Sequence, residues 1–387
     1  MPATDIAVPE VALLVETDNS WGRSVVRGVA DYAQNYGPWN LLIEPREPSQ
    51  DWSFPESWRV DGVIARISTP LLLNQIRARQ VPVVDLGDIF VGEQGVDSVL
   101  TDEAKRSEFA LEHFRSKGFQ HFAYYAPPSR DYSRRRGREY VEAVEQSGAV
   151  CSQYRPGYRV GRRISREEHR HRVGRWLSQL PLPVAVLAVD AQRGKELVEV
   201  CTQENLRIPD QVAILAGETD DLCCEVCFPP LSSIETASGR IGALAAARLA
   251  DRLRGEQALD QPIAVPPVGV IGRQSTDILA IEDPMIVRAL RFMHAHACRG
   301  IVVDDVLAEV PVTRRQLERQ FKRNLGRLPA EELRRIRLER GRQLLSETDL
   351  SIEEVAEACG YSGATQFGSA FRKQYESTPL SFRKKLS

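Results

Sequence analysis

The feature that most constrains the fold of this 387-residue chain is a regular alternation of short apolar runs with amphipathic stretches. Runs such as Val11–Val15 and Val184–Val189 have the length of a strand and are apolar throughout, which is typical of strands buried on both faces of a sheet. The stretch Arg23–Tyr36 instead places apolar residues at helical spacing. Strands that alternate with helices predict an α/β fold with parallel sheets flanked by helices.

The alternation continues to about Leu253. The predicted strands are Val11–Val15, Asn40–Glu44, Gly62–Ala65, Val81–Leu86, Phe119–Tyr125, Val184–Val189 and Val212–Leu215. The predicted helices are Arg23–Tyr36, Leu71–Arg79, Glu103–Ser116, Arg136–Gln146, Arg166–Gln179, Gln192–Asn205 and Ile241–Leu253. Because these strands are too many for one small sheet, we expect two lobes, each with its own parallel sheet.

Composition excludes several classes of protein. With 42% hydrophobic and 27% charged residues, the chain can bury a core and is not disordered. No apolar run approaches the roughly 20 residues of a membrane span, and Met1–Asp5 lacks the features of a secretory signal. Seven cysteines, an odd number, favour reduced thiols over a disulfide framework. We therefore expect a cytoplasmic protein with no membrane partner.

Charge is divided unevenly along the chain. Residues 281–387 carry 19 Lys and Arg against 15 Asp and Glu, a balance of +4, whereas the first 280 residues carry 32 against 38, a balance of −6. An acidic body with a basic C-terminal part is typical of a sensor joined to a nucleic-acid-binding domain. Such a balance is also common on an ordinary solvated surface, so the motifs must decide between the two.

The last hundred residues predict an all-α domain that begins with a helix-turn-helix unit. A short helix, Asp304–Glu309, is followed by a turn and by a second helix that Thr313 can cap. Leu317 and Phe321 give the second helix an apolar face, so the arginines around them face solvent. A cationic second helix of this kind is the type that enters the major groove of DNA.

A second unit repeats the same pattern. Ser351 caps a helix with acidic residues in its first turn, and Cys359-Gly360-Tyr361 forms the turn. Ser362 then caps a helix whose buried face contains Phe367 and Phe371. One helix over Pro329–Leu345 is predicted to connect the units, with arginines outward and with apolar residues inward at Leu333, Ile336, Leu344 and Leu345.

These features resemble the DNA-binding domain of the AraC/XylS family over about Pro284–Lys385, most specifically at Cys359-Gly360-Tyr361, Phe371-Arg372-Lys373 and Thr378-Pro379. The resemblance implies a domain over 284–385 that binds double-stranded operator DNA. The residues expected to contact DNA are Thr313, Arg314, Arg315, Gln316, Arg319, Ser362, Thr365 and Gln366. One departure is Pro311, which stands where glycine is usual and is expected to tighten or tilt the first unit.

The first part of the chain resembles the sugar-binding domain of LacI/GalR regulators and periplasmic binding proteins. The resemblance rests on the shared order of several segments, among them Ala110–Phe119, Ile208-Pro209-Asp210, Pro230–Ile234 and Arg273–Thr276. It implies a two-lobed domain over 7–277. It also implies a ligand between the lobes, at the carboxyl ends of the parallel strands.

A sugar presents hydroxyls and an apolar ring face, so carboxylates, arginines and an aromatic side chain suit it. The residues expected to bind it lie at the predicted strand ends and helix starts: Asp18, Trp21, Arg66, Arg136, Asp190, Glu218 and Asp220. Acids and arginines together would neutralise each other, which fits an uncharged polyhydroxyl ligand. The alternative is that several of these residues cap helices or form salt bridges between the lobes.

Other classes of function remain open at this point. Cys223, Cys224 and Cys227 could form a metal or redox site, but no second pair stands at suitable spacing, so no metal or cofactor is expected. A sugar-processing enzyme could use the same carboxylates as acid and base, although the chain has no nucleophile elbow, phosphate loop or metal-ligand set. A further alternative is a sugar-binding protein whose C-terminal domain serves only protein interaction.

A LacI-like sensor followed by an AraC-type domain is an unusual combination, and it resembles regulators of xylose operons. The resemblance implies a sugar-responsive transcription regulator that acts as an activator, with a pentose as its small-molecule effector. It also implies a homodimer on DNA and RNA polymerase as a partner.

Overall fold

The computed structural model describes residues 8–43, 53–126, 131–155, 165–278, 283–348, 350–375 and 377–384, without the side chains of 131–133, 346, 347 and 384. The chain divides into two compact units. The larger comprises residues up to His113 and Gln120–Asp277, and the smaller comprises Ile278 onward together with Phe114–Phe119. The predicted domain limits, 7–277 and 284–385, stay predictions, because residues 7, 279–282 and 385 lie outside the described residues.

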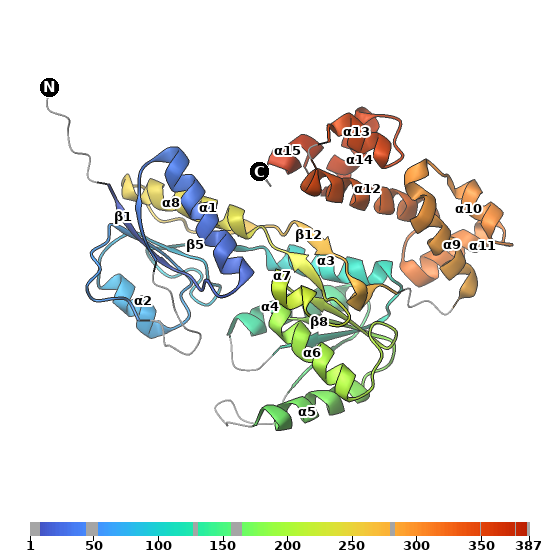
Figure 1. Cartoon of the computed structure of the whole chain (residues 1–387), viewed down its shortest axis with the longest axis horizontal. Coiled ribbons are helices and arrows are strands. Elements are labelled where there is room, and N and C mark those ends of the chain that lie inside the picture. The colour runs from blue at the N-terminus through green and yellow to red at the C-terminus, as the bar shows by residue number, and fades with distance from the viewer. Residues whose placement is uncertain are drawn as a thin grey trace. The chain divides into compact units, whose positions relative to one another are not determined.

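The larger unit contains two six-stranded sheets, one in each lobe (Figure 1). The first has the strand order β11-β5-β4-β3-β1-β2 and is parallel throughout. Its strands are β1 (Glu10–Leu14), β2 (Asn40–Ile43), β3 (Gly62–Ala65), β4 (Val83–Asp85), β5 (Val96–Thr101) and β11 (Ile263–Val265). The second has the order β12-β10-β9-β8-β6-β7, in which only β12 pairs antiparallel to its neighbour. Its strands are β6 (His121–Tyr125), β7 (Cys151–Gln153), β8 (Val184–Ala188), β9 (Val212–Ala216), β10 (Ser232–Glu235) and β12 (Gly269–Ile271).

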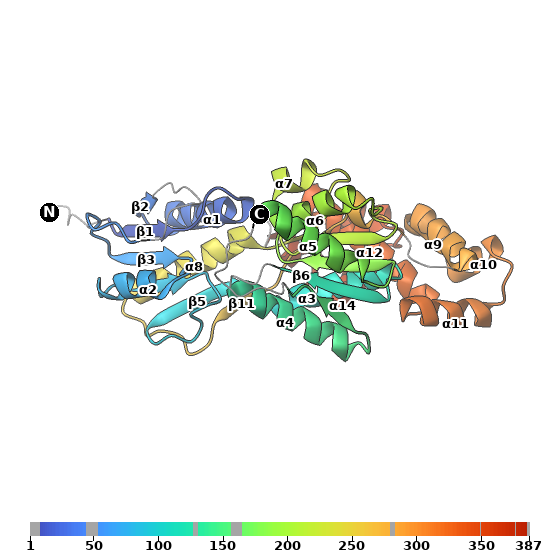
Figure 2. The same ribbon diagram turned by 90° about the horizontal axis from the view of Figure 1, so that it is seen from below.

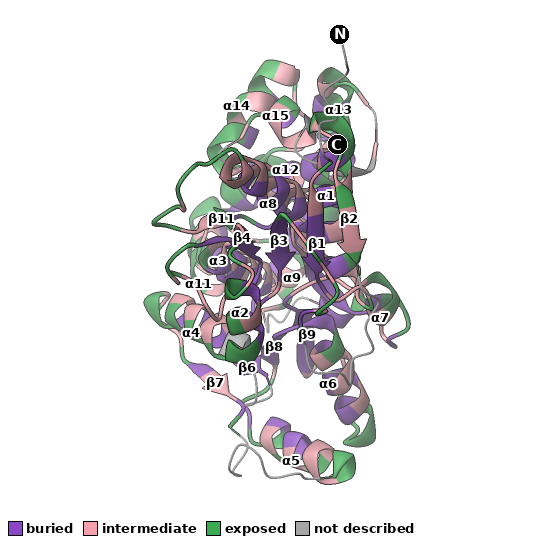
Figure 3. Cartoon of the chain, turned by 90° about the vertical axis from the view of Figure 1, so that its left-hand side faces the viewer, coloured by how far each residue is buried: buried purple, intermediate pink, exposed green. Residues whose placement is uncertain are grey.

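Helices flank both sheets, as the alternation predicts. They are α1 (Ser20–Tyr36), α2 (Pro70–Arg77), α3 (Glu103–Ser116), α4 (Asp131–Gln146), α5 (Arg166–Ser178), α6 (Ala191–Gln203), α7 (Asp221–Glu225) and α8 (Ser238–Leu253). Along β1, Val11 and Leu13 pack with α1 and α8, whereas Ala12 and Leu14 pack with α2, so both faces of the strand are buried (Figure 3). Helices α1 and α8 lie side by side (Figure 2). Glycine at position 28 permits this close approach, since a Cβ there would come within 1.9 Å of the Gly239 carbonyl oxygen.

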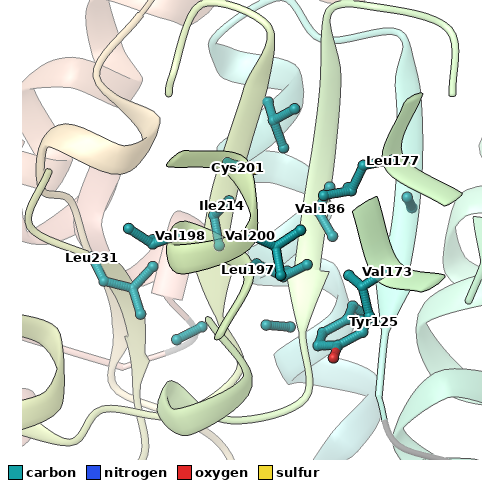
Figure 4. Close-up of a cluster of buried hydrophobic side chains, with 14 of the residues drawn as sticks. Tyr125, Val173, Leu177, Val186, Leu197, Val198, Val200, Cys201, Ile214 and Leu231 are labelled. Carbon is teal, nitrogen blue, oxygen red and sulfur yellow. The ribbon is translucent and has the colours of Figure 1, made fainter. Parts of the chain in front are cut away.

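The core of the second lobe lies between its sheet and helices α5 and α6 (Figure 4). Val173 and Leu177 of α5 and Leu197 and Cys201 of α6 are fully buried against strands β6, β8 and β9. The chain passes between the lobes three times, after β5, after β10 and between β11 and β12. The expected two-lobed α/β architecture is therefore confirmed.

Strand β5 is the clearest element that the pattern of apolar runs does not predict. Its six residues are all buried, yet Asp97 interrupts their apolar character. The Asp97 carboxylate accepts hydrogen bonds from Arg248 Nε of α8 at 3.1 Å and from the Leu259 amide at 2.7 Å. Arg252 Nε lies 3.6 Å from its second oxygen. A strand can bury a charge when a neighbouring helix supplies the counter-charge, and only the fold provides that helix.

The smaller unit is all helical. Its helices are α9 (Pro284–His296), α10 (Val303–Glu309), α11 (Arg314–Leu325), α12 (Pro329–Glu347), α13 (Ile352–Ala358), α14 (Ala364–Tyr375) and α15 (Pro379–Lys384), with a 3₁₀ turn over Ala297–Arg299. Leu333 and Ile336 of α12 belong to a core shared with α9, α10 and α11, whereas Leu338, Leu344 and Leu345 belong to a second core shared with α13 and α14. The predicted pair of helix-turn-helix units on one connecting helix is confirmed.

The prediction that the arginines of α12 point outward is wrong for several of them. Arg342 is buried and pairs with Glu339 at 2.7 Å, and Arg337 Nε donates to the Ala297 carbonyl oxygen at 2.8 Å. Arg335 pairs with the fully buried Glu332 at 2.8 Å. Arg337 therefore ties α12 to the 3₁₀ turn, whereas Arg335 and Arg342 pair with glutamates of α12 itself, and all three belong to the internal structure of the unit. Within the described part of the chain, no helix is long and apolar enough to cross a membrane.

Removing the carboxylate of Asp97 should strongly destabilise the first lobe. Asp97→Ala leaves the buried Arg248 guanidinium without its most buried partner, and we expect a loss of about 3 kcal/mol in the free energy of unfolding. Chemical denaturation measures it. Arg207→Gln breaks an exposed pair with Asp210 and should cost less than about 1 kcal/mol. Equal losses in the two variants would contradict the role given to Asp97.

Candidate functional site

Charged side chains gather where the strands of the second sheet end. Arg136 of α4 lies between two carboxylates, with Nη1 3.2 Å from Glu218 Oε2 and Nε 3.4 Å from Glu103 Oε1. Arg106, one turn after Glu103 on α3, pairs with Glu103 and donates from Nη1 to the Gly217 carbonyl oxygen at 3.1 Å. Glu103 and Arg106 are both buried. Helices α3 and α4 and the loop after β9 thus build one charge network.

The surroundings of the network shift the pKa values of Glu218 and Arg106. Burial raises the pKa of Glu218, but Arg136, Arg66 and Arg106 outweigh burial and hold this pKa below its usual value. Burial lowers the pKa of Arg106, and the neighbouring Arg136 lowers it further, whereas Glu103 and Glu218 oppose the shift. Two arginines and two glutamates balance in charge. The group therefore offers both donors and acceptors to a molecule that carries no charge itself.

Glu103 and Arg106 were not among the predicted site residues. Both lie in the first turn of a predicted helix, where a Glu and an Arg three residues apart normally form a solvated pair. Their spacing in the sequence predicts that pairing, but it does not show that the first turn of α3 is buried. The buried position follows from the passage of the chain between the lobes after β5.

In the first lobe, Arg66 and Trp21 lie together. The Arg66 guanidinium lies over the Trp21 ring, 5.0 Å from the ring centroid, and pairs with Glu16 Oε2 at 3.1 Å. Trp21 itself is 8% exposed and belongs to the core formed by α1 and β1. Its ring was expected to cover a sugar, and in this structure Arg66 lies over that ring. The guanidinium is attracted to the face of the aromatic ring, as in other cation–π pairs, and this attraction holds the two side chains together.

Asp85, at the end of β4, is a buried acid that the sequence did not single out. Its Oδ1 accepts hydrogen bonds from the amides of Ile67 at 2.9 Å and Gly87 at 2.8 Å, which ties the ends of β3 and β4 together. Burial raises the pKa of Asp85 to about 7, Asp88 adds to the increase, and the two amides and Arg66 oppose it. The sequence feature that could have identified this buried acid is the presence of an aspartate within the apolar run Val81–Leu86.

The aspartates predicted at the site also have local structural roles. Asp190 caps α6 through a hydrogen bond from the Arg193 amide at 2.8 Å. Asp220 caps α7 in the same way, and its second oxygen accepts from the Ser20 amide of the first lobe at 3.0 Å. Asp18 is exposed and accepts from the Asn19 amide side chain at 3.2 Å. Helix capping and contact between the lobes, the alternative considered above, therefore both occur, and ligand contact by these aspartates stays a prediction.

The cysteine-rich segment is packed into the second lobe. Cys224 and Cys227 are buried, and Cys223 Sγ donates to the Ala191 carbonyl oxygen at 3.4 Å. Burial raises the pKa of Cys223 to about 12 and that of Cys227 to about 11, so both stay thiols near neutral pH. The described residues contain no group of three or more His, Cys, Asp or Glu side chains arranged to hold a metal ion.

In the smaller unit, α11 presents a strongly basic face. Thr313 caps the helix together with Gln316, whose side-chain oxygen accepts from the Thr313 amide at 2.9 Å. Arg314 is engaged by Asp304 at 3.3 Å and Glu318 at 3.4 Å. Arg315 and Arg319 are exposed and pair with none of the described residues. Of the predicted DNA-contacting arginines, these two are the ones available to an incoming ligand.

Helix α14 repeats this geometry with a different surface. The Ser362 hydroxyl donates to the Gln366 side-chain oxygen at 3.0 Å, and the Ala364 amide donates to Glu353 of α13 at 3.2 Å. Thr365 and Gln366 are exposed. The second unit therefore presents small polar groups at the positions where the first presents arginines.

The turns of the two units differ because of Pro311. In the first unit the Val312 amide donates to the Val310 carbonyl oxygen at 2.8 Å, a three-residue turn around Pro311 that suits the fixed φ of proline. In the second, Gly360 has φ of +76°, and a Cβ there would come within 2.8 Å of the Cys298 carbonyl oxygen. Leu317, which follows this turn, still packs in the core, and whether Pro311 tightens or tilts the first unit stays a prediction.

Comparison with known proteins matches three families to successive parts of the chain. A family described as periplasmic binding protein-like domain matches residues 111–276, and one described as XylR N-terminal domain matches residues 10–101. A family described as helix-turn-helix domain matches residues 306–385.

Two curated relatives are similar along almost the whole chain. The xylose operon regulatory protein of Escherichia coli K12 is 31% identical over 380 residues, which cover 96% of each protein. That of Haemophilus influenzae is 28% identical over 97% of this chain and 98% of the relative. A solved structure described as the xylose-binding transcription activator xylR has a TM-score of 0.63 at 29% identity and covers 98% of both chains. The regulator CelR in complex with cellobiose, at 21% identity, has a TM-score of 0.54 over 69% of this chain and 84% of that one, a likeness of fold alone.

The raised pKa of Asp85 predicts a specific pH dependence of stability. An acid whose pKa rises on folding contributes stability at low pH, and this contribution is lost as the pH rises toward 7. Asp85→Asn cannot ionise, so its thermal stability relative to the wild type should increase between pH 5 and pH 8, as melting curves would show. Asp31→Asn, on the exposed side of α1, should leave the pH dependence unchanged. Parallel curves for wild type and Asp85→Asn would contradict the raised pKa.

Proposed function

The chain belongs to the family of xylose operon regulatory proteins, and from this premise we propose that it is a pentose-responsive activator. It is a sugar-responsive DNA-binding transcriptional regulator, with a sugar-binding unit of two lobes followed by two helix-turn-helix units. Its relatives are transcription regulators, which argues against the enzyme considered above. The pentose, the sense of regulation and the residues named below form the proposal.

The observation that carries the proposal is the charge-balanced network of Glu103, Arg106, Arg136 and Glu218. Hydroxyl groups of a sugar can donate to the glutamates and accept from the arginines without adding net charge to a buried place. A charged ligand would leave one pair uncompensated, at a cost of several kcal/mol. A similar solved protein is described as xylose-binding, which supports a pentose.

The proposed response couples the sugar to the arrangement of the lobes. Asp220 of the second lobe accepts from Ser20 of the first, so the lobes already exchange hydrogen bonds where we place the ligand. A sugar that prefers one arrangement tenfold shifts the balance by about 1.4 kcal/mol, and one that prefers it a hundredfold shifts it by about 2.8 kcal/mol. The set Asp18, Trp21, Arg66, Arg136, Asp190, Glu218 and Asp220 stays our proposal for the ligand shell, extended by Glu103 and Arg106.

On the DNA side, Arg315 and Arg319 are the proposed base-contacting residues of the first unit. They are one helical turn apart, exposed and free of described partners, as bidentate contact with guanine requires. We place Thr365 and Gln366 in the same role in the second unit, and Thr313, Arg314, Gln316 and Ser362 beside them. A homodimer that binds two half-sites and contacts RNA polymerase completes the proposal.

A panel of sugars tests the effector. We expect D-xylose or a related pentose, but not an unrelated hexose, to raise the melting temperature of the wild type, because a ligand that binds only the native state stabilises it. Arg136→Gln should abolish this increase. Asp190→Ser keeps a capping oxygen for α6 but is too short to reach a ligand, and it should also abolish the response.

Asp190→Ala is the variant to compare with Asp190→Ser, since it removes both the cap of α6 and the proposed ligand contact. If Asp190→Ser responds to sugar like the wild type, Asp190 is a cap only. Recovery of the sugar unchanged after incubation is expected for a regulator, whereas conversion to a product would support the enzyme instead.

Arginine replacements test the DNA face. Arg315→Ala and Arg319→Ala should each reduce the preference for operator over random duplex by about 1–3 kcal/mol while leaving the sugar response intact. Arg314→Ala should have a smaller effect, because Asp304 and Glu318 already engage this side chain. Titration of fluorescent duplexes measures both. An effect largest for Arg314→Ala would show that the first unit docks in another orientation.

A further inference from the structure

The two helix-turn-helix units are in contact at a second place besides the connecting helix. The 3₁₀ turn over Ala297–Arg299 leads from α9 into the first unit, and Ala297 is buried in the core that this unit shares with α9. Cys359, in the turn of the second unit, is buried in the other core. Resting on the proposed binding of operator DNA by both units, we propose that the contact between these two turns sets the separation of α11 and α14. It thereby sets the spacing of the two DNA segments that one chain reads.

The two turns touch through their backbones. Gly360 has φ of +76°, and a Cβ there would lie 2.8 Å from both the Cys298 carbonyl oxygen and the Gly300 amide nitrogen. Gly300, which ends the 3₁₀ turn, also has a left-handed backbone, with φ of +80°. Glycine at 360 therefore serves both the sharp turn and the close approach of the other turn. Backbone atoms cannot move aside as the end of a side chain can, so the contact fixes one turn against the other.

Arg337 ties the same 3₁₀ turn to the connecting helix α12. Its Nε donates to the Ala297 carbonyl oxygen at 2.8 Å, and its Nη2 donates to the Ile301 carbonyl oxygen. Ala297 begins the turn and Ile301 follows it, so one planar guanidinium spans the turn with donors in a fixed geometry. The positive charge also suits the C-terminal end of α9, where the helix dipole is negative. Arg337 is therefore a positioning residue, which acts through the turn that it holds.

The connecting helix by itself leaves the separation adjustable. Leu333 and Ile336 of α12 pack in the first core and Leu338 and Leu344 pack in the second, so the two cores meet near the middle of the helix. Long helices bend gently along their length, and a bend at this point would change the distance between α11 and α14. Arg337 lies at the same point. Its bonds to the turn, together with the contact of the turn with the second unit, oppose such a bend.

The geometry of DNA makes the separation matter. One base pair occupies about 3.4 Å along the duplex and about a tenth of a helical turn. A chain that follows an inserted base pair must therefore move α14 relative to α11 by several ångströms and rotate it as well. Such a movement would break the packing of the two turns and the bonds of Arg337. With the contact intact, the chain should accept one spacing.

Selection of binding sites from a random duplex pool by the full chain tests the proposal. We expect the wild type to select two segments at one spacing of about one helical turn. Gly360→Ala, which forces the turns apart, should select at least two spacings. Insertion or deletion of one base pair should cost the wild type at least about tenfold in affinity and Gly360→Ala about threefold or less.

Gly326→Ala is the matched control for Gly360→Ala. Gly326 also has a left-handed backbone, with φ of +72°, but a Cβ there would meet none of the described atoms within 4 Å. The control introduces the same backbone strain without touching the two turns. It should therefore select the wild-type spacing.

Arg337→Gln tests the other half of the contact and should also select more than one spacing. Arg340→Gln removes the same charge from an exposed position of α12, where Arg340 donates to Gln343 of the same helix at 2.8 Å. This control should keep the wild-type spacing. If Arg337 only stabilised the fold, its replacement would lower the melting temperature and leave the selected spacing unchanged, so the spacing is the measurement that decides.

Short duplexes that carry one of the two segments separate a loosened contact from an unfolded unit. Each variant should bind them as its control does, because each helix-turn-helix unit keeps its own core. If Gly360→Ala and Arg337→Gln bind these duplexes normally and still select a single spacing, the proposal is overturned. The proposed function fails separately, if the wild type selects no sequence at all.

Should either variant lose binding to a single segment, Arg337→Lys takes its place. The lysine keeps a charged donor for one carbonyl but cannot present two donors in a fixed plane. It should therefore fold and still select more than one spacing. A single spacing for Arg337→Lys would equally reject the proposal.

Discussion

The burial of charge is the constraint on which this structure most depends. Each buried ion costs several kcal/mol to remove from water, so it must meet a partner of opposite sign in good geometry. Here Asp97 with Arg248 joins a strand to a helix of the first lobe, whereas Glu332 pairs with Arg335 within the connecting helix. The pairs that include Arg136 join α3, α4 and the loop after β9.

One of these networks lies where we propose that the sugar binds. Glu103, Arg106, Arg136 and Glu218 satisfy one another in this structure, and they do so where the strands of the second sheet end. Hydroxyl groups can exchange hydrogen bonds with such a set while its charges stay balanced. The same pairing that makes charge burial tolerable in the lobe therefore also suits the uncharged, hydroxyl-rich effector that we propose.

The two helix-turn-helix units show how one internal plan supports two surfaces. Leu317 and Phe321 in the first unit and Phe367 and Phe371 in the second fill equivalent core positions. The exposed positions differ, because α11 carries free arginines and α14 carries small polar groups at its start and cations in its last turn. The two units therefore present different chemical groups on their exposed faces.

Features set by near neighbours were determined by the sequence itself: apolar periodicity, helix caps such as Thr313 and Ser351, and the Pro311 and Cys359–Tyr361 turns. They depend on spacings of a few residues, which a sequence displays directly. Strand β5 could not be predicted in this way, because its buried Asp97 pairs with Arg248, a residue far away in the sequence. Only the tertiary structure decided that Arg136 meets Glu218, that Ser20 meets Asp220 and that Glu103 is buried. These pairings join residues up to 200 positions apart, and their existence depends on the path of the chain between the lobes.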